Sequence, residues 1–157
     1  MSYADVLETF KVNTLGPLFV MKHFLPLFPR DSLPETELFP HDFSVIANMS
    51  ARVGSIADNR LGGWYSYRSS KAAQNQITKT LGMELGMGGY KAVAIGYHPG
   101  TVETALSGEM GRKRLEKGEK GVFNVDEAID KMMRVMGGLR EKDSGIVLDW
   151  EGKQVPW

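Results

Sequence analysis

Residues 65–100, YSYRSSKAAQNQITKTLGMELGMGGYKAVAIGYHPG, carry the signals of a helix, a turn and a buried strand in succession. Over residues 65–85 apolar side chains recur at three- and four-residue steps, which is the periodicity of an α-helix. The glycines at 86–89 end this helix. The short apolar run KAVAIGY, at 91–97, predicts a buried strand. The HPG that follows predicts that this strand ends sharply.

The segment before this unit repeats the same order of elements. From about Ala4 to Phe28 apolar residues recur at helical steps, with an interruption that predicts a kink near Asn13. The next segment is rich in proline and acidic residues and predicts a loop, and Phe43 to Ala47 then predicts a second buried strand. Residues 50–63 are glycine-rich and polar, so we expect a long loop there.

The segment after residue 100 adds a third helix and a third strand. Residues 101–121 include RKRLEKGEK, whose mixed charges predict a variable, solvated surface loop. A helix from Val125 to Leu139, capped by Asn124 or Asp126, and a strand from Ile146 to Leu148 follow. The alternation predicts one α/β domain over residues 1–157, built on a parallel sheet with flanking helices.

Composition narrows the kinds of partner. Lysine and arginine together number 19, as do aspartate and glutamate, so no strong field draws the chain to nucleic acid or an anionic membrane. The chain has no cysteine, which excludes disulfides and thiolate metal sites. With no secretory signal and no apolar run of membrane-spanning length, we expect a soluble, cytoplasmic protein whose partner is a small molecule or another protein.

Tyr67 and Lys71 are the residues whose spacing first points to chemistry. They lie four apart on the predicted helix, so their side chains share one face. An ammonium near a phenol lowers the pKa of the phenol, which suits a general acid/base. A tyrosine and a lysine at this spacing also occur by chance, so the pair needs support from its surroundings.

That support comes from three strings in a fixed order: NMSARVGSI at 48–56, YSYRSSKAA at 65–73 and HPGTVET at 98–104. Together they resemble the short-chain dehydrogenase/reductases. The stretch GSIADNRLGGWYSYRSSK resembles the C-factor and sniffer-like carbonyl reductases within that family. The resemblance covers nearly the whole chain. It implies a Rossmann-type, doubly wound parallel sheet, of which this chain holds the last three strands with their flanking helices.

The resemblance also implies roles for single residues. Tyr67 would donate a proton to a substrate carbonyl while hydride comes from a nicotinamide. Lys71 would hold the cofactor ribose and lower the pKa of Tyr67. Asn13, in VNTLG, would position a water molecule for proton relay, although a polar helix-breaker beside Gly16 and Pro17 is the alternative.

The catalytic serine is where the sequence departs from the family pattern. The family hydroxyl usually comes three residues before the glycine, and here Ala51 occupies that position. Ser50 and Ser55 are the available substitutes, since a hydroxyl beside the expected point could bond the carbonyl oxygen as charge develops on it. We prefer Ser50, with capping of the loop as its alternative role.

The HPGTVET string supplies the expected cofactor contacts beyond Tyr67 and Lys71. By resemblance, Pro99 and Gly100 form the turn after a strand, backbone groups near Val102 meet the nicotinamide amide, and the Thr104 hydroxyl reaches phosphate. Backbone groups just past a strand's carboxyl end line the ligand crevice of an open parallel sheet. We expect His98 to pack at the strand end, because no second histidine lies at metal-binding spacing.

A dinucleotide fold also needs a glycine-rich loop between its first strand and first helix. Residues 80–88, TLGMELGMG, have the glycine spacing of that loop, but they lie where a helix ends and a strand begins. We therefore predict that the N-terminal nucleotide-binding half is missing and that the strand at residue 43 has an open edge.

Three functions compete at this point. The first is an NADP- or NAD-dependent reductase acting on a small carbonyl or alcohol, with NADP preferred. The second is a non-catalytic fragment that forms a homo-oligomer or pairs with a full-length relative through its helices. The third is a serine hydrolase, which the lack of a G-x-S-x-G motif disfavours.

Overall fold

The computed structural model describes residues 1–157 apart from the side chain of Met110. A three-stranded parallel sheet lies at its centre, in the order β1-β2-β5. The strands are β1 (Ser44–Met49), β2 (Ala92–His98) and β5 (Val147–Asp149). All three confirm the positions of the predicted strands to within a few residues, and the parallel α/β architecture is confirmed. The prediction that the first strand is buried was wrong, because β1 is an edge strand and only Asn48 of its residues is buried.

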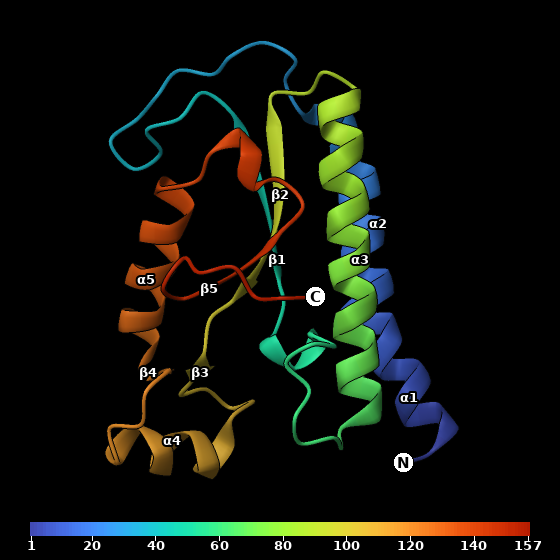
Figure 1. The fold of residues 1–157 in the computed structure, drawn as a ribbon, viewed down its shortest axis with the longest axis vertical. Helices are drawn as coiled ribbons and strands as arrows, with labels where there is room; N and C mark the ends of the chain where they lie inside the picture. The colour runs from blue at the N-terminus through green and yellow to red at the C-terminus, as the bar shows by residue number, and fades with distance from the viewer.

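Helices cover both faces of this sheet (Figure 1). On one face lie the N-terminal helices α1 (Tyr3–Phe10) and α2 (Gly16–Phe24), together with the long helix α3 (Tyr65–Met87). On the other face lies α5 (Val125–Gly137). None of the described helices is long and apolar enough to cross a membrane.

Alternate residues of β2 point into two separate apolar cores. Val93, Ile95 and Tyr97 face α5 and pack with Met136 and other apolar side chains. Ala92 and Ala94 face the other way, where the small side chains let the helices α2 and α3 approach the sheet closely. This is the period-two alternation of a strand that is buried on both faces.

The predicted kink near Asn13 is present as a turn of π-helix, η1 (Lys11–Leu15), between α1 and α2. Pro17 has no backbone N–H, so it cannot donate to the carbonyl of Asn13 in the helical ladder. The Gly16 N–H instead donates to the carbonyl of Lys11, five residues back. The insertion widens the helix at Asn13 and turns this segment toward α3.

The prediction of a loop over 101–121 was wrong. This segment contains β3 (Thr101–Val102), which pairs in parallel with β4 (Val122–Phe123), and the helix α4 (Gly108–Glu116). The charges of α4 are spaced to form ion pairs one turn apart, Lys113 with Glu109 at 2.8 Å and Arg112 with Glu116 at 3.9 Å. Such pairs support an exposed helix that has little apolar periodicity.

The sequence 80–88, with glycine spacing like that of a phosphate loop, lies at the end of α3. Gly82 lets α3 pack closely against the backbone of Gly145, because a Cβ at position 82 would lie 2.5 Å from the Gly145 nitrogen. The prediction that these glycines belong to a helix C-terminus is confirmed.

Candidate active site at the carboxyl end of the sheet

The candidate site lies where β1 and β2 end and α3 begins (Figure 1). Ser50 follows β1, and the Pro99-Gly100 turn follows β2. Tyr67 and Lys71 lie in the first two turns of α3. Parallel strands bring their carboxyl ends to one edge, so these segments meet although they are far apart in the sequence.

Tyr67 and Lys71 differ in their surroundings. Tyr67 is 37% exposed, whereas Lys71 is 8% exposed and its ammonium donates to the carbonyl of Met49 at 2.6 Å and to Gln74 Oε1 at 3.0 Å. Burial raises the pKa of Tyr67 and lowers the pKa of Lys71. The expected lowering of the Tyr67 pKa by Lys71 is not found, because burial of the phenol shifts this pKa the other way.

The Ser50 hydroxyl is already bonded within the protein. Its Oγ donates to Asn75 Oδ1 at 2.5 Å, and both side chains are buried. The alternative, Ser55, is also buried and accepts a hydrogen bond from the backbone N–H of Asp58 at 3.0 Å. Ala51, at the usual position of the family hydroxyl, is buried as well.

Asn13 is linked to the candidate site by a hydrogen bond to Ser70 of α3. Its Nδ2 donates to Ser70 Oγ at 3.1 Å, and the neighbouring Thr14 hydroxyl donates to the Ser70 carbonyl at 3.0 Å. Ser70 lies between Tyr67 and Lys71 on the helix and is fully buried. The π-turn is thus fixed against the helix that carries the proposed acid/base.

The sequence analysis missed the polar stripe on α3 that makes these bonds. It consists of buried polar residues one helical turn apart: Ser70, Lys71, Gln74, Asn75 and Thr78. The Thr78 hydroxyl accepts from Asn48 Nδ2 at 2.9 Å, which ties the stripe to β1. Polar residues repeating at steps of four on the side of α3 that faces the sheet are the signal that could have revealed it.

The segment predicted to contact cofactor begins with a turn that requires glycine. Gly100 has φ +80°, and a Cβ there would lie 2.6 Å from the carbonyl oxygen of Gly121. Val102 ends β3 and is half-buried. Thr104 is exposed, and its hydroxyl lies 3.4 Å from the Val102 carbonyl, a weak hydrogen bond that a ligand can replace.

His98 lies at the end of β2, near the ion pair between Arg52 and Asp149. Its ring contacts the edge of Trp150, with centroids 5.1 Å apart, and Arg52 binds the buried carboxylate of Asp149 at 3.1 Å. Burial and the nearby Arg52 charge lower the pKa of His98 to about 4. Among the described residues, no group of three or more His, Asp or Glu side chains is arranged to hold a metal ion.

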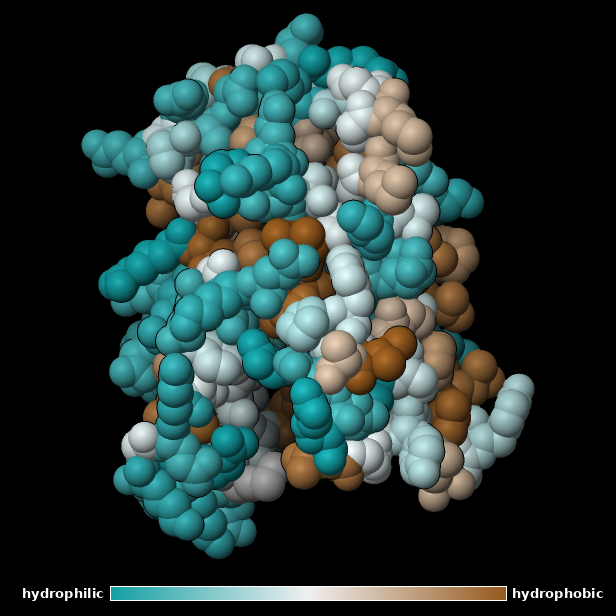
Figure 2. Space-filling model, in the orientation of Figure 1, coloured by the Kyte–Doolittle hydropathy of each residue, from teal (hydrophilic) through white to brown (hydrophobic). Residues whose placement is uncertain are grey.

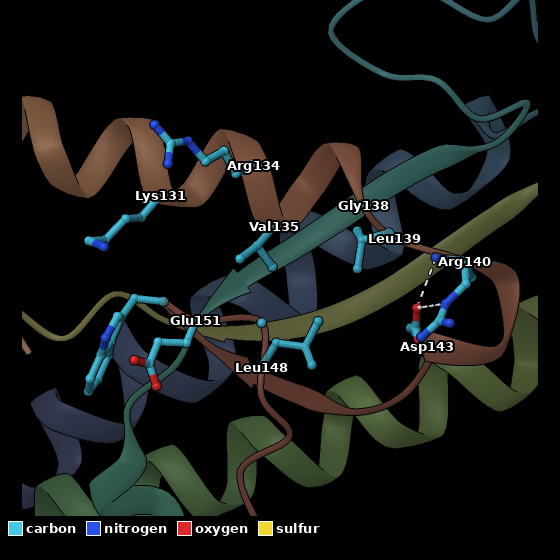
Figure 3. Close-up of a pocket in the computed structure, with 11 residues that line it drawn as sticks. Lys131, Arg134, Val135, Gly138, Leu139, Arg140, Asp143, Leu148 and Glu151 are labelled. Carbon is cyan, nitrogen blue, oxygen red and sulfur yellow. Dashed lines mark hydrogen bonds and ion pairs between the residues drawn. The ribbon is translucent and has the colours of Figure 1, made fainter.

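Two cavities flank the sheet. A groove of about 660 Å³ runs between β1 and α2 and is lined by Asn13, Met49 and Lys71 among others, so it opens onto the candidate site. A second cavity, of about 330 Å³, lies between α5 and β5 (Figure 3). Its cations Lys131 and Arg134 extend from α5 without meeting, and it contains none of the predicted site residues.

Residues 1–115 match the short chain dehydrogenase family. The chain belongs to the short-chain dehydrogenases. Over its full length it is 34% identical to C-signal of Myxococcus xanthus and spans 81% of that protein. It is 28% identical to the 1-hydroxy-2-glutathionyl-2-methyl-3-butene dehydrogenase of Rhodococcus sp. (strain AD45), of which it spans 61%.

Solved structures of other short-chain dehydrogenases share this fold. The NADPH-bound carbonyl reductase from chicken fatty liver is 33% identical to this chain, with a TM-score of 0.80. The carbonyl reductase Sniffer of D. melanogaster is 27% identical, with a TM-score of 0.82. In both comparisons all of this chain is covered, and it spans 59% of the solved chain.

Proposed function

We propose that this short-chain dehydrogenase interconverts a small carbonyl compound and its alcohol, with NADP or NAD as cofactor and Tyr67 as the acid/base. The observation that carries the proposal is the position of Tyr67 and Lys71 on one face of α3, at the carboxyl end of the parallel sheet. We assign NADP as the preferred cofactor, because the chicken and Burkholderia multivorans relatives are described with NADPH or NADP bound.

When bound, the nicotinamide supplies or accepts the hydride. Tyr67 would donate the proton to the substrate oxygen in reduction and accept it in oxidation. Burial raises the pKa of Tyr67, so its phenol is protonated near neutral pH and would be the proton donor in carbonyl reduction, but the same shift makes it a weaker acid than a phenol beside a free ammonium.

Lys71 would act as a binding group. An ammonium carries three protons, of which two are committed to Met49 and Gln74, so one remains for a ribose hydroxyl. The Thr104 hydroxyl and the backbone after Pro99 and Gly100 would complete the contacts to the cofactor. These groups fit the nicotinamide end of a dinucleotide.

Ser50 and Asn13 would have supporting roles. We assign the substrate-binding hydroxyl to Ser50, which has to exchange its bond with Asn75 for one to the carbonyl oxygen. Its contribution is therefore smaller than that of a hydroxyl aimed at the substrate in advance. Asn13 holds Ser70 with its amide nitrogen, which leaves its carbonyl oxygen to accept from a relay water.

The first experiment is titration of the purified chain with NADPH and NADH, followed by cofactor fluorescence. We expect saturable binding that Lys71→Ala abolishes and that Lys142→Ala, an exposed substitution on the far side of the fold, leaves intact. Failure of a folded chain to bind either nucleotide would overturn the proposal for this chain.

The second experiment measures turnover. Carbonyl reduction with the bound nucleotide should be lost in Tyr67→Phe and retained in Tyr65→Phe, which removes a phenol hydroxyl from a more exposed position on another face of the same helix. Equal activity in the two variants would exclude Tyr67 as the acid/base.

An alternative function is association with another chain, and a specific surface favours it. Exposed apolar residues follow the N-terminal helices, and Figure 2 shows them as brown patches along the right-hand side, where Figure 1 places α1 and α2. They include Leu15, Leu18, Phe19, Val20 and Phe24. Exposed apolar patches that gather along one pair of helices are typical of surfaces that bind another protein.

Analytical ultracentrifugation tests this alternative. We expect a homodimer, or a complex with a full-length relative, that Phe19→Glu dissociates. A chain that stays monomeric with and without that relative would contradict it.

A further inference from the structure

The loop that leads into α3 has an unusual backbone. It runs over residues 55–64, after the short 3-10 helix η3 (Arg52–Gly54). Its last three residues, Gly62, Gly63 and Trp64, all have left-handed backbone conformations, with φ of 63°, 69° and 48°. Trp64 is the single non-glycine residue with positive φ in the part of the chain that the structure describes, and such a conformation costs about 1–2 kcal/mol.

Arg68 joins the last residues of this loop to the 3-10 helix η3 that precedes it. Its Nε donates to the carbonyls of Gly62 at 3.2 Å and Gly63 at 3.1 Å, and one of its terminal nitrogens donates to the Val53 carbonyl at 3.2 Å. The guanidinium also lies over the Trp64 ring, 5.8 Å from its centroid. A planar group with donors on several sides can make all these contacts at once, whereas an ammonium cannot reproduce the arrangement.

The two halves of the loop are held differently. In the first half, the Ala57 N–H donates to the carbonyl of Trp157 at 2.8 Å, and Asp58 pairs with Arg52 at 3.2 Å. Across residues 59–64 of the described chain, the side chain that hydrogen-bonds the loop to the rest of the molecule is that of Arg68. The half of the loop next to Tyr67 therefore depends on one guanidinium.

We infer that Arg68 is a positioning residue: it locks the 55–64 loop and so holds Trp64 beside Tyr67 as a wall of the substrate site. Trp64 is the N-cap residue of α3 and precedes Tyr67 by three residues, so the two side chains leave the helix within one turn of each other. The inference rests on the proposed acid/base role of Tyr67 for its catalytic meaning. The clamp itself rests on the contacts of Arg68 alone.

Limited digestion with trypsin tests the clamp, because Arg60 is exposed in the middle of the loop. In Arg68→Met we expect cleavage after Arg60, followed by mass spectrometry of fragments 1–60 and 61–157, to become at least about tenfold faster, as expected for loss of two or more hydrogen bonds. Arg68→Lys should be cleaved nearly as fast as Arg68→Met. Arg112→Met, on the exposed face of α4, should be cleaved at the original rate.

A second variant keeps the test open if Arg68→Met fails to fold. Gly63→Ala adds a methyl where nothing lies within 4 Å, so it disturbs only the left-handed backbone. It should also speed cleavage after Arg60 by about tenfold. Unchanged cleavage in the folded variants would overturn the clamp.

Kinetics then tests the positioning role. In Arg68→Met the KM for the carbonyl substrate should rise about tenfold, with kcat changed less than about twofold, since Tyr67 stays on its helix while the wall beside it loosens. A loosened loop with an unchanged KM would overturn the role of the wall. If the unaltered chain shows no turnover, the proposed function fails, while the digestion still decides whether Arg68 clamps the loop.

Discussion

Replacing Ser50 with alanine separates a role in the fold from a role in the reaction. The Ser50 hydroxyl donates to Asn75 Oδ1 at 2.5 Å, and the two side chains are 5% and 3% exposed. Ser50→Ala leaves the amide oxygen of Asn75 without this donor in a region closed to water. A buried acceptor that loses its partner costs about 1–3 kcal/mol, so we expect the free energy of unfolding to fall by that amount.

The effect on catalysis should be smaller than for a dedicated donor. Removing a hydroxyl that is aimed at a developing oxyanion costs about 10²–10³ in kcat. Ser50 must first leave Asn75, and that cost offsets most of the gain from bonding the substrate. We therefore expect kcat to fall by about tenfold or less in Ser50→Ala.

Urea denaturation checks the predicted fall in the free energy of unfolding, and single-substrate kinetics on the same preparations checks the predicted fall in kcat. Ser55→Ala is the matched control, because it removes a buried hydroxyl that accepts from Asp58 and should lower stability without changing kcat. If Ser50→Ala unfolds at the original urea concentration, or loses activity by a hundredfold or more, the reasoning about its bond to Asn75 is wrong.

Three further predictions concern single positions. Gly82→Ala should lower stability by at least about 2 kcal/mol in thermal melts, because the new Cβ would lie 2.5–2.6 Å from the backbone of Gly145, whereas Gly86→Ala, with nothing within 4 Å, should be neutral or stabilising. Ala51→Ser should raise the kcat/KM of carbonyl reduction about tenfold by restoring a hydroxyl at the family position, and an unchanged value would show that this position does not face the substrate. His98, with its pKa lowered to about 4, stays neutral in the fold while the unfolded chain takes up a proton below about pH 6.5, so stability should fall by up to about 3 kcal/mol between pH 6.5 and 4. Urea midpoints that do not shift across this range, or that shift equally in His98→Phe, would contradict the pKa assignment.

The elements of the fold were predictable where a pattern repeats. The helix that carries Tyr67 and the strands that begin near residues 44 and 92 have regular apolar repeats over much of their length, so periodicity located them. The segment 101–121 was missed for the opposite reason. Its strand β3 and the partner strand β4 that follows it have two residues each, and its helix buries little, so these elements leave no apolar period in the sequence.

The candidate site also has features that could be predicted from the sequence and features that could not. The pairing of Tyr67 with Lys71 is a consequence of helix geometry and could be predicted from their spacing. The direction of the Tyr67 pKa shift could not be predicted, because it depends on how far the phenol is buried after folding. Burial raises the pKa of Tyr67, and Met49 and Gln74 accept two of the protons of the Lys71 ammonium.

The sequence by itself determined the fold class, the order of the elements and the identity of the helix that presents the acid/base, because these follow from local periodicity and from motifs in a fixed order. Tertiary structure alone decided the partners of Ser50, Asn13 and Arg68. Their hydrogen bonds join segments up to 57 residues apart, and such pairs exist only after the sheet has brought strand ends and helix entry together. A hydroxyl or guanidinium has the same chemistry in every sequence, but packing selects the acceptor that it meets.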